Sequence, residues 1–264
     1  MIHSTGGSAL KHLTIWLATA AMCAPVAFSP GLSHAAESVD DMIAHHVTAR
    51  GGADALKAIK TISITGKFRP PGFDSDLAYS ETIARPGSAR INITLQGLTI
   101  VQSYDGKSGW QIQPFGGRKD PETLSTDDVK SLEEEADFEG GLIDYKAKGN
   151  TVVYQGMEDV DGAPAHAIRV NLKNGDTQTF YLDPDAWLTV RLTTRSIQRG
   201  VENVTETDFG DYEKVAGVYF PFEQESGPKG SSQRQRITYE KLEVNTAIDQ
   251  NQFVQPAAKP AAGH

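Results

Sequence analysis

The sequence predicts a mainly β fold with some α-helix, built on an antiparallel meander of about eleven strands. Three observations lead to this prediction. Apolar and polar residues alternate over most of the chain, tight-turn dipeptides separate the alternating stretches, and only two stretches have helical spacing. Strict alternation indicates half-buried strands with one wet face. Because a long antiparallel meander tends to curl, we expect the helices to lie on its concave side.

Composition limits the class of protein before any motif is considered. The chain has 264 residues, of which 39% are hydrophobic, and a formal net charge of -9. This apolar fraction is sufficient for a packed core. The acidic balance argues against a nucleic-acid partner, which clustered Lys and Arg would have to bind. It also argues against attachment to anionic lipid through a polybasic segment.

The first 35 residues have the features of a cleavable signal peptide. Their apolar run, residues 13–28, is interrupted by Pro25 and is shorter than the ~20 residues that a membrane span needs. Small residues at Ser33 and Ala35 suit cleavage just after Ala35. The alternative is an uncleaved anchor helix, which the prolines disfavour. We therefore expect export to the periplasm.

The single cysteine lies in this leading segment. Cys23 is inside the apolar run and follows Met22, whereas lipid attachment needs a small residue directly before the cysteine. Lipidation is therefore not predicted. Cleavage before Ala36 would leave a chain without cysteine, so its stability would depend on its core rather than on disulfides.

Helical spacing is confined to two parts of the exported chain. Residues 38–50 begin at a capping Ser38 and end at Gly51-Gly52, and a short helical turn over residues 53–60 follows. Residues 124–138 begin with Ser and Thr caps and carry a run of acids on their polar side. We interpret that acidic side as the wet face of a helix.

The remaining sequence has the two-residue period of β-strands. Three dipeptides between the alternating stretches favour tight hairpins, namely Asp105-Gly106, Asp161-Gly162 and Asn174-Gly175. The predicted strands span residues 61–68, 90–95, 110–113, 150–156, 165–173, 176–183, 187–198, 201–212, 217–226 and 232–244. Residues 256–264 are rich in Pro and Ala and are predicted to be a disordered tail.

Catalytic and metal-binding motifs are not recognisable in the exported part of the sequence. His45 and His46 are adjacent, so they point to different sides of a helix and cannot share a metal. The Ser226-x-x-Lys229 spacing contains Gly-Pro, which cannot open the helix that penicillin-recognising enzymes need. The acidic run 133–139 lacks the pattern of a calcium loop. We therefore predict no metal, no cofactor and no enzymatic activity, although carboxylate pairs for glycoside hydrolysis stay an open alternative.

Large apolar side chains gather on one face of the predicted strands. A curled sheet can pack such a face solid or leave a cavity for an apolar ligand. Each methylene group buried there would contribute roughly 0.8 kcal/mol, so an acyl chain could be held without specific polar contacts. The candidate lipid-binding residues are Ile62, Ile64, Ile91, Ile93, Leu95, Trp110, Ile112, Leu132, Ile168, Val170, Phe180, Leu182 and Leu192.

Five short segments combine turn and strand signatures and are spread over most of the chain. They are HVTARGG (46–52), YDGKSGW (104–110), FYLDP (180–184), DFGDY (208–212) and GVYFPF (217–222). Together they resemble the LolA/LolB-like superfamily, the "outer membrane lipoprotein-sorting protein" group, over about residues 40–255. None of the five is a catalytic signature.

The resemblance implies a fold and a function for residues 36–255. The fold would be an unclosed antiparallel β-barrel of about eleven strands, with helices covering its concave face. The function would be to bind the acyl chains of lipoproteins or other lipids in the periplasm, as a carrier or chaperone in lipoprotein transport and outer membrane biogenesis. The arginine that holds the lid of the best-known carrier has no counterpart by motif, and Arg90 is a strand candidate only.

Two alternatives stay open at this point. The chain could be an envelope-stress sensor or scaffold that binds an inner- or outer-membrane protein through its β surface. It could also be an enzyme that acts on an envelope substrate. The space between sheet and helices distinguishes the three functions, because a lipid carrier needs an open apolar cavity, a scaffold tolerates a filled core, and an enzyme needs convergent carboxylates.

Overall fold

A computed structural model describes residues 37–115 and 120–257 of the chain. The chain divides into two compact units, residues 1–36 and Glu37–His264, and all that follows concerns the second. The predicted signal peptide and its cleavage site lie outside the described residues, as do residues 258–264 of the predicted tail.

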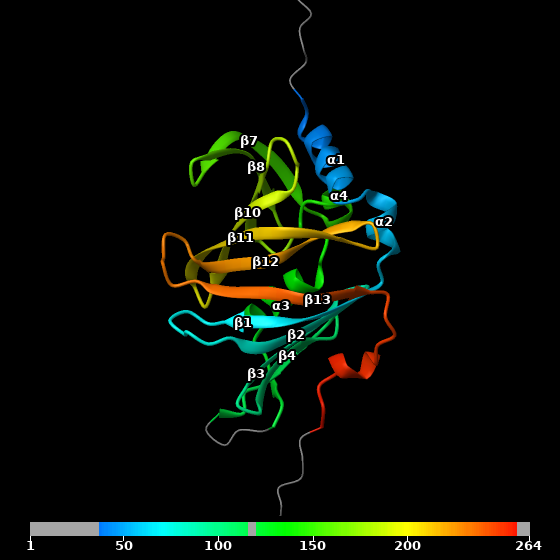
Figure 1. Ribbon diagram of the computed structural model, residues 1–264, viewed down its shortest axis with the longest axis vertical. Coiled ribbons are helices and arrows are strands. Elements are labelled where there is room, and N and C mark those ends of the chain that lie inside the picture. The colour runs from blue at the N-terminus through cyan, green and yellow to red at the C-terminus, as the bar shows by residue number, and fades with distance from the viewer. Residues whose placement is uncertain (1–36, 116–119, 258–264) are drawn as a thin grey trace, which may run out of the picture. The chain divides into compact units, whose positions relative to one another are not determined.

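One antiparallel sheet forms the framework of this unit (Figure 1). Its thirteen strands lie in the order β6-β5-β4-β3-β2-β1-β13-β12-β11-β10-β9-β8-β7. Strands that follow one another in sequence are therefore neighbours, except β6 and β7, and the pairing of β1 with β13 joins the two ends of the meander. Because β6 and β7 form the two edges, the sheet is an unclosed barrel, as the sequence predicts.

The strands have the following bounds: β1 Thr61–Arg69, β2 Leu77–Ala84, β3 Ser88–Leu95, β4 Leu98–Tyr104, β5 Gly109–Ile112, β6 Glu122–Thr123, β7 Thr151–Val160, β8 Ala163–Asn171, β9 Thr177–Leu182, β10 Thr189–Gln198, β11 Val201–Val215, β12 Val218–Pro228 and β13 Gln235–Val244.

The mainly β fold with helices is confirmed, and the sheet has two strands more than the predicted eleven or so. β2, β4 and β6 are not among the strands that alternation predicts. In β2 the row of inward side chains contains Glu81 between Tyr79 and Ile83, so a carboxyl group interrupts the apolar period. β6 is only two residues long, too short for any period to be detected.

Three helices occupy the predicted helical stretches: α1 Val39–Ala49, α2 Ala53–Ala58 and α3 Thr126–Ala136. α1 begins with a capping box between Ser38 and Asp41, and α3 begins at Ser125, whose hydroxyl accepts from a first-turn backbone N–H. Two further short helices are present, α4 Tyr145–Lys148 and the 3₁₀ helix η2 Gln250–Phe253. Four residues give no helical period, so the sequence pattern does not predict them.

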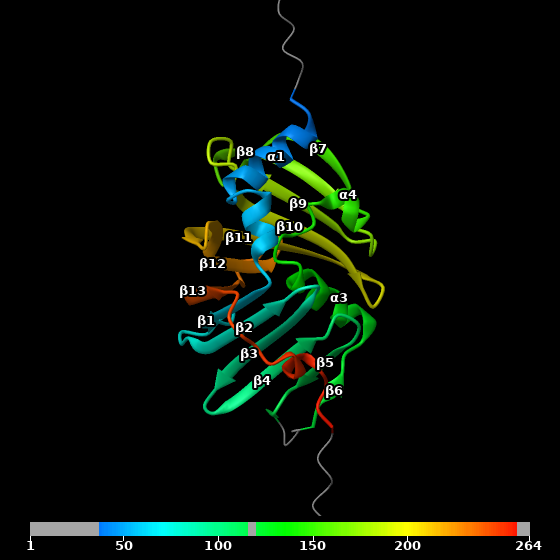
Figure 2. The same cartoon turned by 90° about the vertical axis from the view of Figure 1, so that its right-hand side faces the viewer.

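The helices cover different parts of the curled sheet (Figure 2). α3 contacts β2, β3, β4 and β5 on one side and β10 on the other, so it bridges the curl. α1 packs over the β8–β9 end, where Met42 and Ile43 join a core with Ile168, Val170 and Leu182. A second core lies beneath α2 and α3 and includes Leu56, Ile59, Ile62 and Leu132. The side chains of both cores come from the same face of the sheet.

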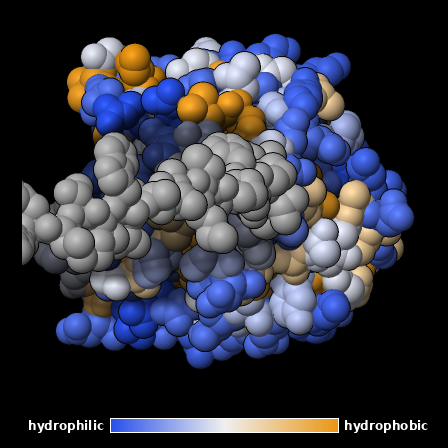
Figure 3. Space-filling view, turned by 90° about the horizontal axis from the view of Figure 1, so that it is seen from above, coloured by the Kyte–Doolittle hydropathy of each residue, from blue (hydrophilic) through white to orange (hydrophobic). Residues whose placement is uncertain are grey.

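No helix in the described part of the chain is long and apolar enough to cross a membrane. The face seen in Figure 3 is mostly hydrophilic, with apolar residues gathered in small separate areas.

Candidate functional site

A cavity of about 500 Å³ lies between the curled sheet and α3 together with the segment that follows α3. We refer to it as the sheet cavity. Its volume is within the range of sites for small organic ligands. Strands β1, β2 and β9 to β13 supply the sheet side of the wall, and residues 131–140 supply the helical side.

The wall of the sheet cavity is divided into an apolar and a polar part. Aliphatic side chains come from β1, β2 and β13, at Ile62, Ile64, Ile83 and Leu242. Aromatic rings extend this apolar part, at Phe180, Phe209, Phe220 and Tyr239. Uncharged polar side chains come from β10 and β11, at Thr194, Ser196, Gln198, Thr205 and Thr207. The cavity is therefore amphipathic, whereas the sequence predicts a mainly apolar interior.

Four of the predicted lipid-binding residues line the sheet cavity: Ile62, Ile64, Phe180 and Leu192. Six others pack into the cores around it and do not reach its wall. Ile91, Ile93 and Leu132 belong to the core beneath α3, and Ile168, Val170 and Leu182 belong to the core beneath α1. Leu95 is half-buried at the end of β3, on the same face as Ile93. The role of these residues in binding lipid stays a prediction.

Trp110 and Ile112 lie on the other face of the sheet, contrary to the placement given by the sequence. The register pairs Trp110 with Ser103 and Ile112 with Val101, on the face opposite to Ile91. The Trp110 indole donates to the carbonyl oxygen of Phe253 at 2.7 Å. The segment containing η2 therefore covers this outer face, so apolar residues are buried there as well and alternation alone cannot tell which face is inner.

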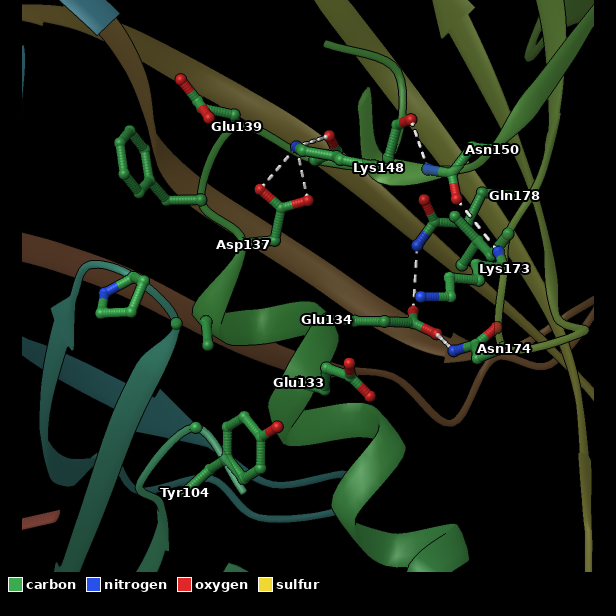
Figure 4. Close-up of a pocket in the computed structure, with 18 of the residues that line it drawn as sticks. Tyr104, Glu133, Glu134, Asp137, Glu139, Lys148, Asn150, Lys173, Asn174 and Gln178 are labelled. Atoms are coloured by element: carbon green, nitrogen blue, oxygen red, sulfur yellow. Dashed lines mark hydrogen bonds and ion pairs between the residues drawn. The ribbon is translucent and has the colours of Figure 1, made fainter. Parts of the chain in front are cut away.

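The segment after α3, residues 137–140, lines both the sheet cavity and a second cavity of about 540 Å³, which Figure 4 shows. Lys148 holds this segment by donating to Asp137 Oδ2 at 2.6 Å and to the Gly140 carbonyl at 2.8 Å. Arg85 binds the buried Glu139 from the other side, with Nη2 and Oε1 2.8 Å apart. Burial raises the pKa of Asp137, an effect that the Lys148 ammonium opposes.

Arg50 is the buried cation of the sheet cavity. Its Nε donates to the Tyr219 carbonyl at 3.0 Å, and burial lowers its pKa. Its position depends on Gly51, where a Cβ atom would lie 2.2 Å from the Gly217 carbonyl oxygen. Only glycine permits this close approach of α1 to the β11–β12 turn. The sequence signal for Arg50 is its place directly before Gly51-Gly52.

Two carboxyl groups meet beneath α3 at the wall of the sheet cavity. Glu81 of β2 is 1% exposed, and Tyr79 donates to its Oε2 at 2.9 Å. The carboxyl group of Glu135 on α3, which lines the cavity, is its acidic neighbour. Burial and the neighbouring acid raise the pKa of Glu81 well above its usual value, and burial also raises the pKa of Glu135. Both shifts favour the protonated, neutral form of each carboxyl group.

This pair corrects one interpretation of the sequence. The acidic side of α3 is not entirely the wet face of a helix, because Glu134 is half-buried and both Glu134 and Glu135 line the sheet cavity. Nothing in the sequence distinguishes Glu135 from the exposed Glu133 two residues earlier. Among the residues that the structure describes, no group of three or more His, Cys, Asp or Glu is placed to hold a metal ion.

Comparison with known proteins supports the fold. No family model and no curated protein matches the sequence. A solved LolA superfamily protein from Nitrosomonas europaea is similar, with a TM-score of 0.56 and 10% identity over 83% of this chain and 98% of that one. A domain named for outer membrane lipoprotein sorting, from Vibrio parahaemolyticus, gives 0.54 and 12% over 82% and 97%.

A third similar structure is a DUF1329 family protein from Desulfovibrio piger, with a TM-score of 0.53 and 12% identity over 81% of this chain and 96% of that one. At these identities the likeness concerns the fold. The chain has a LolA/LolB-like fold, as its sequence segments suggest.

Proposed function

We propose that this protein binds lipid in the periplasm and carries the acyl chains of lipoproteins or other lipids in the sheet cavity. The observation that carries this proposal is the cavity itself, about 500 Å³ in volume, with an apolar wall of Ile62, Ile64, Ile83 and Leu242. Each methylene group placed against this wall would contribute roughly 0.8 kcal/mol.

Three further observations support the proposal. The same fold occurs in a domain named for outer membrane lipoprotein sorting. The leading 35 residues have signal-peptide features, which would place the folded unit in the periplasm. The polar part of the wall, on β10 and β11, is uncharged and could accept the ester, amide or hydroxyl groups of a lipid. In this proposal the protein acts by binding and not by catalysis.

The test is lipid recovery and lipid uptake. Native mass spectrometry of protein purified from the periplasm is expected to show adducts with the mass of a lipid. The purified protein is also expected to bind a fluorescent fatty acid. Recovery of the protein without lipid, together with no uptake of fatty acid, would contradict the proposal. A stable crosslink to an envelope protein in the same preparation would then favour the sensor or scaffold function.

A pair of variants on β10 tests whether the sheet cavity is the binding site. Thr194 faces the cavity, whereas Ile197 is 60% exposed on the outer face of the same strand. Thr194→Trp fills the cavity and is expected to weaken fatty-acid binding by about tenfold or more, equivalent to ~1.4 kcal/mol. Ile197→Trp adds the same indole outside the cavity and is expected to leave binding unchanged.

A further inference from the structure

Arg50 is the one cation among the described residues that line the sheet cavity, and it is 9% exposed. Its Nε donates to the Tyr219 carbonyl at 3.0 Å, and its Nη2 has a long contact of 3.5 Å with the Phe138 carbonyl oxygen. Its Nη1 donates to no group of the described residues, and no carboxylate among them forms an ion pair with the guanidinium. A buried cation with so few partners is costly, so the cavity calls for an anionic ligand at this point.

The position of the guanidinium is fixed by β12. Tyr219 donates its backbone N–H to the Arg50 carbonyl oxygen at 2.9 Å and accepts from Arg50 Nε. The guanidinium carbon lies 6.0 Å from the centre of the Phe220 ring, which also lines the cavity. The hydroxyl of the neighbouring Tyr212 donates to the Thr189 carbonyl at 2.7 Å, and burial raises the pKa of Tyr212, so this phenol is neutral. The cation is therefore held in place without a counter-charge beside it.

The acids that line the same cavity do not supply this counter-charge. Two of them lie on the segment after α3, and each has a cation of its own, in the pairs Asp137–Lys148 and Glu139–Arg85. Glu134 accepts a hydrogen bond from the Gln178 amide at 2.9 Å. The raised pKa of Glu135 favours its neutral form. The charge of Arg50 is therefore left for a ligand to neutralise.

The apolar wall of the sheet cavity begins beside the guanidinium. Phe220 packs in the same core as Ile62 and Leu242. The partners of these two residues in the strand register, Ile83 and Ile64 respectively, also line the cavity. A hydrocarbon chain attached to an anion at the guanidinium would therefore lie against apolar side chains from its first carbons onward.

We propose that Arg50 binds the carboxylate of a long-chain fatty acid whose hydrocarbon chain lies along the apolar wall of the sheet cavity. This inference rests on the proposed lipid-binding function and names its ligand class. A guanidinium presents parallel N–H groups that match the two oxygens of a carboxylate. A carboxylate also matches the single charge of Arg50, whereas a phosphate monoester carries a charge of about -1.5 to -2.

The experiment compares four probes of equal chain length against the delipidated full chain at pH 7: dodecanoate, dodecanol, dodecylamine and dodecyl phosphate. Each displaces an uncharged fluorescent naphthylamine, so the reporter itself does not depend on the guanidinium. Dodecanoate is expected to bind about tenfold or more tighter than dodecanol and at least as tightly as dodecyl phosphate. Dodecylamine is expected to bind more weakly than dodecanol, because its ammonium group would lie beside a buried cation.

Two variants assign the preference to Arg50. Arg50→Met is expected to abolish the preference for dodecanoate over dodecanol, and the ratio of the two affinities is the readout because general damage to the cavity would weaken both. Arg50→Lys keeps the charge but not the parallel N–H groups, so it is expected to keep part of the preference. Arg195→Met is the matched control. The Arg195 side chain is 54% exposed on β10 and does not line the sheet cavity, so this variant is expected to keep the full preference.

A second measurement uses the unaltered protein and does not depend on the folding of a variant. Carbon NMR of dodecanoate labelled at its carboxyl carbon follows the ionisation of the bound ligand. A neighbouring guanidinium favours the charged form, whereas burial among apolar side chains alone favours the neutral form. The bound carboxyl group is therefore expected to titrate at a lower pH than free octanoate, a soluble fatty acid. Titration at a higher pH would overturn the proposal.

The outcomes separate this inference from the function beneath it. Dodecanol binding as tight as that of dodecanoate would overturn the carboxylate site and leave lipid binding intact. Tighter binding of dodecyl phosphate than of dodecanoate, or an undiminished preference in Arg50→Met, would also overturn it. Failure of all four probes to bind would overturn the carboxylate site together with the proposed function.

Discussion

A single buried histidine shows how the fold changes the chemistry of one side chain. His46 is 1% exposed in α1, and its Nδ1 lies 2.7 Å from the Trp187 carbonyl oxygen. Since a carbonyl can only accept, Nδ1 carries the hydrogen in this contact. Burial and the nearby Arg50 guanidinium lower the pKa of His46 to about 4. The imidazole is therefore neutral wherever α1 is docked at physiological pH.

This leads to a prediction for acid stability. Between pH 6.5 and 4 the unfolded chain binds a proton at His46 that the folded chain does not bind, so stability falls as pH falls through this window. The loss attributable to His46 approaches roughly 3 kcal/mol at pH 4. His46→Asn keeps an N–H near the Trp187 carbonyl but does not titrate. Urea unfolding at pH 7 and pH 4.5 is expected to show a smaller acid-induced loss in the variant, and equal losses would contradict the prediction.

Individual residues also mark the limit of what the sequence predicts. The alternation at 110–113 correctly indicates a strand, yet it assigns Trp110 to the wrong face because η2, far away in sequence, buries the outer face of β5. Glu81 and Glu135 carry no distinguishing signal, because the sequence does not show that one acid is buried and that the other lines a cavity. Such residues become visible only when strand register and helix position are known.

At the scale of elements, the segment after α3 depends on charges supplied by three other parts of the chain. Arg85 follows β2, Lys148 ends α4 and Arg50 follows α1, and each binds residues 137–140. The Arg85 guanidinium also lies 4.8 Å from the centre of the Phe138 ring. These contacts hold residues 137–140, which line both cavities.

Arg85 tests this arrangement. Arg85→Met removes the partner of Glu139, whose side chain is only 6% exposed, and leaves a buried carboxylate unpaired. The expected loss of unfolding free energy is about 3 kcal/mol, because removing one partner leaves the other charge buried and unpaired. Lys57→Met is the control, since Lys57 and Asp144 form an exposed pair at 3.8 Å. That change is expected to cost less than about 0.5 kcal/mol in the same denaturant titration, as exposed pairs do.

The elements that the sequence predicts well are long and have a regular spacing of apolar and polar residues. α1 and α3 have caps and several turns of apolar spacing, so the sequence places them closely. The long strands from β7 to β13 alternate over many residues. α4, η2 and β6 have four residues or fewer, and their formation follows from the elements that they pack against rather than from a local pattern.

At the scale of the whole folded unit, the open barrel contains a cavity where side chains could otherwise pack as a solid core. Side chains that would fill the curl are replaced there by threonine, serine and glutamine from β10 and β11, so part of the sheet faces a cavity instead of a core. An unfilled space of this kind reduces the stability of the empty protein. A ligand that occupies the cavity is expected to restore the lost stability.

This predicts a coupling between ligand concentration and thermal stability. A ligand that binds only the folded state stabilises it by RT ln(1 + [L]/Kd), which is about 2.7 kcal/mol when the free ligand is at a hundred times its Kd. The melting temperature of the delipidated protein is therefore expected to rise steadily with the logarithm of dodecanol concentration. Thr194→Trp occupies part of the sheet cavity, so its melting temperature is expected to respond less, while Ile197→Trp follows the unaltered chain. An equal rise in the melting temperature of all three proteins would mean that dodecanol binds outside the cavity, because the indole at position 194 would then not hinder its binding.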